Sequence, residues 1–141
     1  LNYSYVSDIS PLAKLTKLEK LGLCRTRVSD LSSLAELVTL RELDLSSTRI
    51  TDLSPLADLV NLRTLDLWDT RVTDVSPLAG LENLRELNLK GTSVTDLSPL
   101  AELTNLETLH VGPIYDFPKV EVSDAEVDEL QQALPNCKIV R

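Results

Sequence analysis

The segment LRELDLSSTRITDLSPLADLVN, residues 40–61, decides the fold because the chain repeats it twice more with few changes. Residues 62–83 read LRTLDLWDTRVTDVSPLAGLEN, and residues 84–105 read LRELNLKGTSVTDLSPLAELTN. The leucine that opens each segment recurs every 22 residues along the chain, at Leu18, Leu40, Leu62, Leu84 and Leu106. A fixed period of this length is typical of a solenoid in which each repeat forms one structural unit.

Each repeat carries two local signals. The alternation of leucine with polar residues in RELDL predicts a short strand with one buried face. The Ser-Pro-Leu-Ala that follows predicts a short helical turn, with Ser54, Ser76 and Ser98 as N-caps and the prolines at the first helical position. Successive repeats would then stack their strands in parallel, about 4.8 Å apart, into a concave sheet with the helical turns on the convex side.

The shared phrase LxxLxLxxTxV-[ST]DLSPLAxLxN resembles the leucine-rich repeat family. More narrowly, it resembles the 22-residue class found in bacterial internalins and in a regulatory subunit of protein phosphatase 1. The resemblance implies a leucine-rich repeat solenoid of the α/β class, coiled to the right, with short 3-10 turns on its convex side. Because this fold serves many unrelated partners, it indicates the function only coarsely.

The function that the resemblance implies is protein–protein recognition without catalysis. The C-terminal end resembles the leucine-rich repeat regions of bacterial NACHT-type signalling proteins. That likeness implies the ligand-sensing or autoregulatory part of a larger bacterial protein. Two alternatives stay open, an internalin-like surface adhesin and a phosphatase-regulatory scaffold.

Two polar columns of the repeat have a structural interpretation. Thr26, Thr48, Thr70 and Thr92 stand where the usual leucine-rich repeat has Asn, so we expect the polar groups of the bend to be satisfied in a different way. The aspartates four residues further on are expected to accept backbone N–H bonds at the next turn. They are Asp30, Asp52, Asp74 and Asp96, and the arginines that could neutralise them are Arg27, Arg49 and Arg71.

The repeat phase predicts one leucine-rich repeat domain over residues 1–141. A partial repeat at 1–6 precedes repeats at about 7–28, 29–50, 51–72, 73–94 and 95–122, the last with an insertion at 112–121. Leu1 aligns with the middle of a repeat, and the chain has no methionine, even at position 1. We therefore expect the C-terminal part of a larger protein, whose uncapped N-terminal end frays or self-associates.

A C-terminal cap is expected over residues 123–141. Ser123 and Glu126 have the spacing of a capping box. The helix that they would open places Val127, Leu130 and Leu134 on one face. LPNCKIV, residues 134–140, supplies a last short strand.

Composition limits the choice of partners. Fourteen basic and 22 acidic residues leave a net charge of −8, which argues against nucleic acid or an anionic membrane as the main partner. The sequence contains neither a membrane-spanning run nor a signal peptide. Its two cysteines lie far apart and predict free thiols in a reducing, cytoplasmic compartment. A secreted or cell-surface location is the alternative that an adhesin would need.

The outward positions of the strand vary while the leucines do not. The candidate partner-binding surface is centred on Trp68, an aromatic residue of the kind enriched at binding hot spots, which we expect to be exposed. The residues around it are Asp44, Asp66, Asn88 and His110, flanked by Glu42, Glu86, Arg63 and Arg85. This acidic surface predicts a basic protein surface, or upstream domains of the same polypeptide, as the partner.

Catalytic patterns are absent from the sequence. It has no HExxH, CxxC or GxSxG motif and only four glycines. Asp44 and Asp66 occupy the same position in adjacent repeats, so they could bind Ca²⁺ or share a proton. The alternative is two solvated carboxylates on an open sheet. We therefore predict no enzyme, no cofactor and no metal, with a metal-assisted enzyme as the least favoured function.

Overall fold

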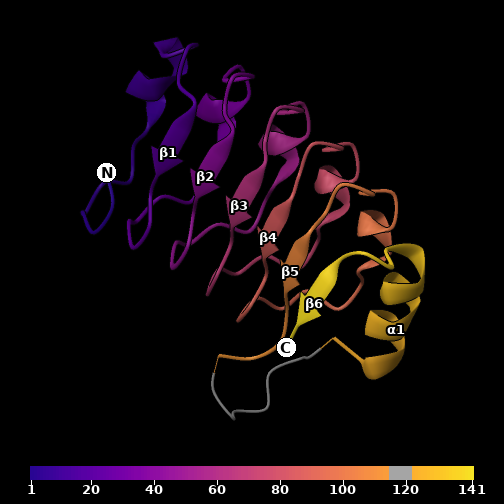
Figure 1. Ribbon diagram of the computed structural model, residues 1–141. Coiled ribbons are helices and arrows are strands. Elements are labelled where there is room, and N and C mark those ends of the chain that lie inside the picture. The colour runs from indigo at the N-terminus through magenta and orange to yellow at the C-terminus, as the bar shows by residue number, and fades with distance from the viewer. Residues whose placement is uncertain (115–121) are drawn as a thin grey trace.

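The computed structural model describes residues 1–114 and 122–141 and shows a solenoid with one parallel sheet (Figure 1). The sheet order β1-β2-β3-β4-β5-β6 follows the order of the chain. The strands are β1 (Lys20–Gly22), β2 (Glu42–Asp44), β3 (Thr64–Asp66), β4 (Glu86–Asn88), β5 (Thr108–His110) and β6 (Lys138–Val140). From β1 to β5, each residue pairs with the residue 22 positions further on, as Leu43 does with Leu65. The predicted parallel stacking is confirmed.

Short 3-10 turns lie across the core from the sheet. They are η1 (Ser10–Lys14), η2 (Ser32–Leu34), η3 (Ser54–Leu56), η4 (Ser76–Leu78) and η5 (Ser98–Leu100). Neighbouring turns contact one another along the stack, as the strands do. The leucine-rich repeat solenoid that the sequence predicts is therefore the observed fold.

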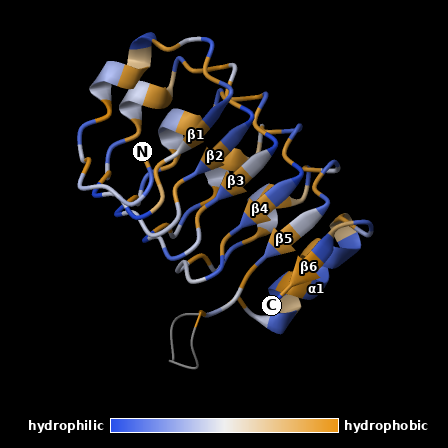
Figure 2. Cartoon of the chain, turned by 60° about the vertical axis from the view of Figure 1, so that its left-hand side comes forward, coloured by the Kyte–Doolittle hydropathy of each residue, from blue (hydrophilic) through white to orange (hydrophobic). Residues whose placement is uncertain are grey.

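The core is one continuous hydrophobic cluster between the sheet and the turns. The side chains of Leu65, Leu67, Leu78 and Leu81 are fully buried. Figure 2 shows hydrophobic and hydrophilic residues alternating along the strands, as expected for a sheet with one buried face. Each fully buried leucine contributes about 1.5–3 kcal/mol, most of which offsets the ordering of the backbone.

The aspartates, and not the serines, supply the side-chain hydrogen bond at the start of the 3-10 turns. The N-cap residues are Leu53, Val75 and Leu97, none with a side-chain cap bond, so the expectation of serine N-caps is wrong. Each serine instead begins the turn, and its N–H donates to the aspartate two residues earlier. The N···Oδ1 distances are 2.8 Å for Ser54–Asp52, 2.8 Å for Ser76–Asp74 and 2.9 Å for Ser98–Asp96. Proline consequently falls at the second position of the turn.

The arginines that could neutralise these aspartates do not form ion pairs with them in the described part of the chain. No ion pair among the described residues joins Arg27, Arg49 or Arg71 to a carboxylate. Hydrogen bonds from the backbone and hydroxyl of Ser76 lower the pKa of Asp74, while the charges of neighbouring aspartates raise it. Hydrogen bonds are therefore what hold this column in its charged form.

The threonine column closes the bend from inside the core. All four threonines are buried, and each hydroxyl donates to the carbonyl of the leucine three residues earlier. The oxygen–oxygen distances are 2.8 Å at Thr26, 2.6 Å at Thr48, 2.9 Å at Thr70 and 2.7 Å at Thr92. Each hydroxyl therefore bonds a carbonyl of its own repeat, and the expectation that Thr satisfies the bend differently from Asn stays a prediction.

In three of the repeats, an asparagine ahead of the strand ties the repeat to the one before. The side-chain amide of Asn61 donates to the carbonyl of Val38 at 2.8 Å. Asn83 and Asn105 bond the preceding repeat in the same way, at 2.8 and 2.9 Å. These bonds lie beside the start of each strand and add to the stacking of the leucines.

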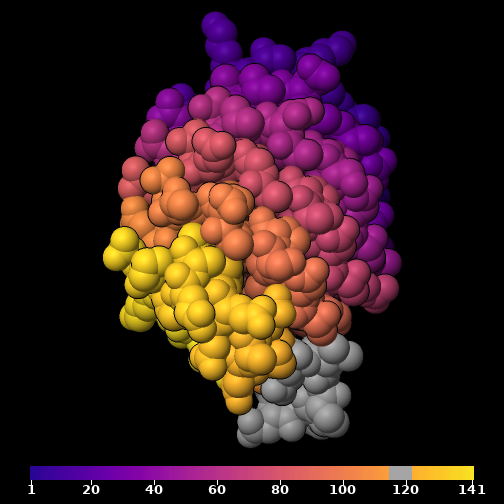
Figure 3. Space-filling model, turned by 90° about the vertical axis from the view of Figure 1, so that its right-hand side faces the viewer, coloured from indigo at the N-terminus to yellow at the C-terminus, as the bar shows by residue number. Residues whose placement is uncertain are grey.

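The C-terminal cap forms largely as expected. Helix α1 (Asp124–Ala133) buries Leu130, while Leu134 follows at its end, also buried. The hydroxyl of Ser123 accepts the Glu126 N–H at 3.2 Å, as in a capping box. The Glu126 carboxylate does not return to Ser123 and instead accepts the N–H of Leu97 at 2.7 Å, which ties α1 to η5. Figure 3 shows these C-terminal residues covering that end of the stack.

The N-terminal end of the stack is more open. Residues 1–6 run beside the turn that follows β1, where the Tyr3 N–H donates to the Cys24 carbonyl at 2.7 Å. Leu15 is 48% exposed, although its counterparts Leu37 and Leu59 are fully buried.

Cys24 and Cys137 are free thiols, and burial raises the pKa of the Cys137 thiol. No helix within the described ranges has the length and apolarity to cross a bilayer.

Candidate partner-binding surface

The outward row of the sheet holds four of the predicted site residues side by side. Parallel pairing places Asp44 beside Asp66, Asp66 beside Asn88 and Asn88 beside His110. All four side chains are half-buried. The sequence placed these residues correctly in one row, because equivalent positions in successive repeats face the same way.

This row has a structural role that the sequence analysis missed. The Oδ1 atoms of Asp44, Asp66 and Asn88 accept the N–H of the residue two positions further on, at 3.0, 2.8 and 3.1 Å. At Gly22, which has no side chain, Asn2 takes over and accepts the Cys24 N–H at 2.9 Å. An Asp or Asn just before each turn was the available signal, since such residues bond the backbone two residues on.

Asp66 is the electrostatic centre of the row. Burial raises the pKa of its carboxyl group, and the charge of Asp44 raises it further. The Trp68 N–H, the Asn88 amide and the charge of His110 lower the pKa, but by less. The negative charge of Asp66 is therefore incompletely compensated within the chain.

Two adjoining hollows in the sheet face meet at Thr64 and Asp66. The first, of about 350 Å³, is lined by Asn2, Lys20, Leu21, Gly22, Glu42, Leu43, Asp44, Thr64 and Asp66. The second, of about 360 Å³, is lined by Thr64, Leu65, Asp66, Glu86, Leu87, Asn88, Thr108 and His110. The structure thus brings six of the predicted site residues together around these hollows.

Trp68 lies at one end of this surface and outside the lining of both hollows. It stands in the turn after β3, where its carbonyl accepts the Ser47 N–H at 2.7 Å and its N–H donates to Asp66. Its side chain is half-buried, so the expectation of an exposed tryptophan is wrong. The turn lets the residue after it, Asp69, adopt a φ of +54°.

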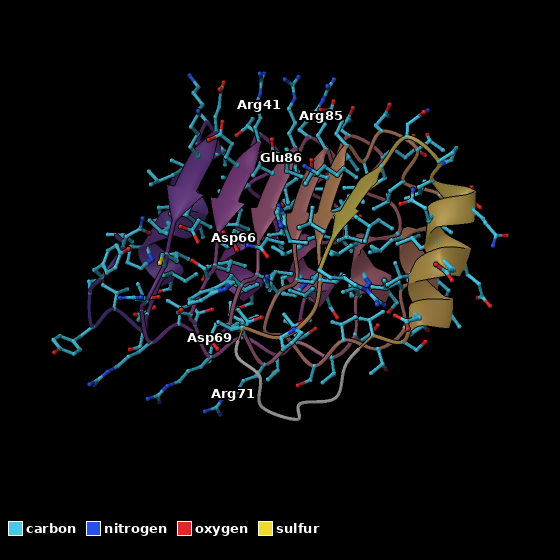
Figure 4. The ribbon with its side chains drawn as sticks, turned by 60° about the horizontal axis from the view of Figure 1, so that its bottom comes forward. Arg41, Asp66, Asp69, Arg71, Arg85 and Glu86 are labelled. Carbon is cyan, nitrogen blue, oxygen red and sulfur yellow. The ribbon has the colours of Figure 1, made fainter. Side chains whose placement is uncertain are left out.

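The arginines flank the opposite edge of the sheet face. Figure 4 shows Arg41 and Arg85 along one edge, Asp69 and Arg71 along the other, and Asp66 between them. The guanidinium of Arg85 pairs with Glu107 at 2.5 Å. Arg63 has no ion pair within the described residues. Glu42 pairs with Lys20 at 2.6 Å, and Glu86 is exposed.

The start of the predicted insertion packs against the carboxyl-end edge, which is the side of the sheet where the strands end and the turns follow. Gly91 adopts a φ of +76°, and a Cβ at this position would collide with the side chain of Ile114. A glycine is therefore required on two grounds, its backbone conformation and the close approach of Ile114. Residues 115–121, the rest of the insertion, lie outside the described residues.

No group of three or more His, Cys, Asp or Glu side chains among the described residues is placed to hold a metal ion. Asp44 and Asp66 lie close enough for one charge to raise the pKa of the other. Each also has one oxygen engaged by the backbone.

The chain is similar to known leucine-rich repeat proteins in both sequence and structure. A family model of two-copy leucine-rich repeats matches residues 38–80 and 82–120. Internalin C2 of Listeria monocytogenes is 41% identical with a TM-score of 0.73, over 74% of this chain and 46% of its own. A second internalin of that organism is 31% identical with a TM-score of 0.85, over 99% and 39%. A comparison with curated protein sequences gives no match.

A leucine-rich repeat protein of Leptospira interrogans shares the fold, with 24% identity and a TM-score of 0.86 over all of this chain and 36% of its own. The chain spans less than half the length of each of these solved structures. Such solenoids typically act as non-catalytic scaffolds for protein binding. The repeats, the sheet and these likenesses agree, and the chain belongs to the leucine-rich repeat family.

Proposed function

We propose that the chain recognises another protein, or another part of its own polypeptide, through the sheet face. The observation that carries this proposal is the pair of adjoining hollows that meet at Asp66. Their polar lining differs from repeat to repeat, whereas the leucines beneath it do not. Because the strands hold this surface rigid, a docking partner loses little entropy in ordering it.

The partner should place a basic group beside Asp66. Burial and the Asp44 charge both disfavour the charged carboxylate, so a lysine or arginine from the partner would relieve an existing cost. The net charge of −8 would also attract a basic partner from a distance. These two effects predict an association rate that falls as salt is added.

The first experiment locates the surface. A photo-crosslinking residue at Thr108, in the lining of the second hollow, should capture the partner from an extract of the source cell. The same residue at Asp58, exposed just after η3, should not. Capture counts only if the purified partner then binds the chain in isolation. Capture at Asp58 alone would place recognition on the convex side and overturn the proposal.

The second experiment measures the charge. Changing Asp44 and Asp66 together to Asn keeps an oxygen for each backbone bond and removes two charges. We expect slower association and a weaker salt dependence. The matched control is Glu36→Gln with Asp58→Asn, which removes the same charge from the exposed convex side. Equal effects of the two double variants would mean that only net charge matters.

Trp68 gives a third test at the end of the same surface. Trp68→Ala should weaken binding by about 2 kcal/mol or more if this aromatic side chain is a hot spot. Its half-buried position means that unfolding must be measured in parallel. Unchanged affinity would confine recognition to the hollows.

A cell-surface adhesin is the second candidate, favoured by the identity to two internalins. In that case the protein captured at Thr108 would come from the surface of another cell and not from the extract of the source cell. Running the crosslinking against both materials separates the two functions.

A further inference from the structure

Three consecutive repeats carry an arginine at the same exposed position, immediately after the buried threonine. Arg27, Arg49 and Arg71 form this arginine ladder. Their backbone N–H groups donate to the carbonyls of Val6, Val28 and Ile50, at 2.8, 3.1 and 3.1 Å. The ladder is thereby held in register, with one cation per repeat.

Nothing within the described part of the chain neutralises the ladder. The ion pairs there involve Lys20, Arg41, Arg85 and Arg141 instead. Arg27 lies over the ring of Tyr5, with its Cζ atom 4.7 Å from the ring centroid. The charges acting on nearby Asp74 come from Asp96 and Asp52, both of which raise its pKa.

Stacked like charges cost free energy, and the fold does not require them here. The equivalent positions in the flanking units are Tyr5 and Ser93, which are uncharged. A position that accepts tyrosine and serine has no structural need for a cation. A partner that supplies negative charge would explain why three successive repeats carry arginine.

We propose that the arginine ladder binds the acidic face of a helix in a partner protein. The spacing argues for a helix. Adjacent repeats lie about 4.8 Å apart, and side chains at i and i+4 of a helix have Cβ atoms about 5–6 Å apart. Carboxylates on one face of an extended strand are about 6.6 Å apart, which differs more from the spacing of the repeats. Each guanidinium can also take a carboxylate in a two-bond geometry.

The ladder continues into exposed aromatic surface. Tyr5 is 83% exposed and Tyr3 is 71% exposed, and Arg25 lies 5.4 Å from the ring centroid of Tyr3. Tyrosine at the end of the row offers apolar area to the aliphatic part of a docked helix. This surface lies along the carboxyl-end edge, where Figure 4 shows Arg71 on the side of the sheet opposite Arg85.

The test uses two stapled, alanine-based helical peptides labelled with fluorescein. One carries three glutamates in a row at i, i+4 and i+8. Its isomer spreads them around the helix at i, i+5 and i+10. Fluorescence anisotropy in about 100 mM salt should show the row peptide binding the wild-type chain, and the isomer binding at least about threefold more weakly. Exposed charges more than about 10 Å apart are largely screened at this ionic strength, so the measured affinity reports on the contacting pairs.

Two triple variants form the matched comparison. Changing Arg27, Arg49 and Arg71 to Gln should weaken the row peptide at least about fivefold, since three charge-assisted contacts are lost. Changing Arg41, Arg63 and Arg85 to Gln alters the net charge equally on the opposite edge and should change affinity less than about twofold. Circular dichroism checks that both variants are folded.

Four outcomes would overturn the proposal: no binding of the row peptide, equal losses in the two triple variants, equal affinity for the isomeric peptide, or tighter ladder-dependent binding of a polyphosphate of equal charge. The double change of Asp44 and Asp66 to Asn should leave peptide affinity within about twofold, because those side chains lie on the sheet face. Failure of this proposal is therefore distinguishable from failure of recognition through the sheet face.

Discussion

Aspartates at two positions of the repeat affect stability in opposite directions with pH. Hydrogen bonds from Ser76 lower the pKa of Asp74, so its contribution is present above the unfolded value of 3.8 and is lost as the pH falls through the lowered folded pKa. Burial raises the pKa of Asp66, so its charged form costs stability at neutral pH. That cost disappears as the pH falls through the raised folded pKa.

Asp66→Asn should therefore increase the free energy of unfolding at neutral pH. The Asn side chain keeps an oxygen for the Trp68 N–H and removes both the buried charge and the repulsion from Asp44. The advantage should shrink as the pH falls through the raised folded pKa towards 3.8. Urea unfolding across that range measures it, with exposed Asp58→Asn as the control. A variant less stable than the wild type at neutral pH would contradict the assigned cost.

At the scale of the elements, a carboxylate of α1 ties the helix to the last 3-10 turn, in addition to the packing of Leu130. Glu126→Ala should lower the free energy of unfolding by about 1.5–3 kcal/mol, because the Leu97 N–H loses a charged acceptor 2.7 Å away. Glu129→Ala, at an exposed position of the same helix, should change stability by less than about 0.5 kcal/mol. Thermal unfolding of the pair compares them, and equal stabilities would mean that water replaces the Glu126 bond.

The bend after β4 depends on Ile114 and Gly91 fitting together. Gly91→Ala should destabilise the chain by at least about 1 kcal/mol, since its φ is +76° and the new Cβ meets Ile114. Combining it with Ile114→Ala should cost less than the sum of the two single changes, because the collision is removed. A double-mutant cycle measures this coupling, for which about 0.5–3 kcal/mol is usual for residues in contact. Additive losses would place the whole cost in the backbone conformation.

At the scale of the whole molecule, stability should vary along the stack. Among the described residues, the strands and turns pack against those of the neighbouring repeats, so the repeats in the middle are supported on both sides. At the C-terminal end, α1 and β6 cover the last repeat (Figure 3). At the other end Leu15 stays 48% exposed, so the first repeat has the least support.

Amide hydrogen exchange should follow this gradient. We expect fast exchange within residues 1–17 and slow exchange in β2 to β5, because local opening costs least where few apolar contacts are lost. Sedimentation at increasing concentration tests whether the exposed apolar end also self-associates. Uniform protection up to residue 1 in a monomeric chain would contradict both expectations.

The sequence by itself determined the repeat, the parallel register and the inward face. These properties follow from signals inside one repeat, such as the alternation around Leu65, and the 22-residue period then carries them along the chain. It also predicted which residues share the outward row, and that the Asp column caps the turns. Residues with equivalent positions must have equivalent surroundings, so one repeat predicts the next.

The tertiary structure alone decided which groups each polar side chain meets. Ser54 begins the turn and donates its N–H to Asp52 instead of acting as the N-cap. Glu126 bonds Leu97, 29 residues away, instead of Ser123. Trp68 is half-buried, and no ion pair among the described residues joins the arginine ladder to the aspartates three residues further on. Several acceptors of similar hydrogen-bond free energy are available to each donor or charged group. The distances in the folded chain decide which of them is bonded, and the spacing along the sequence does not give those distances.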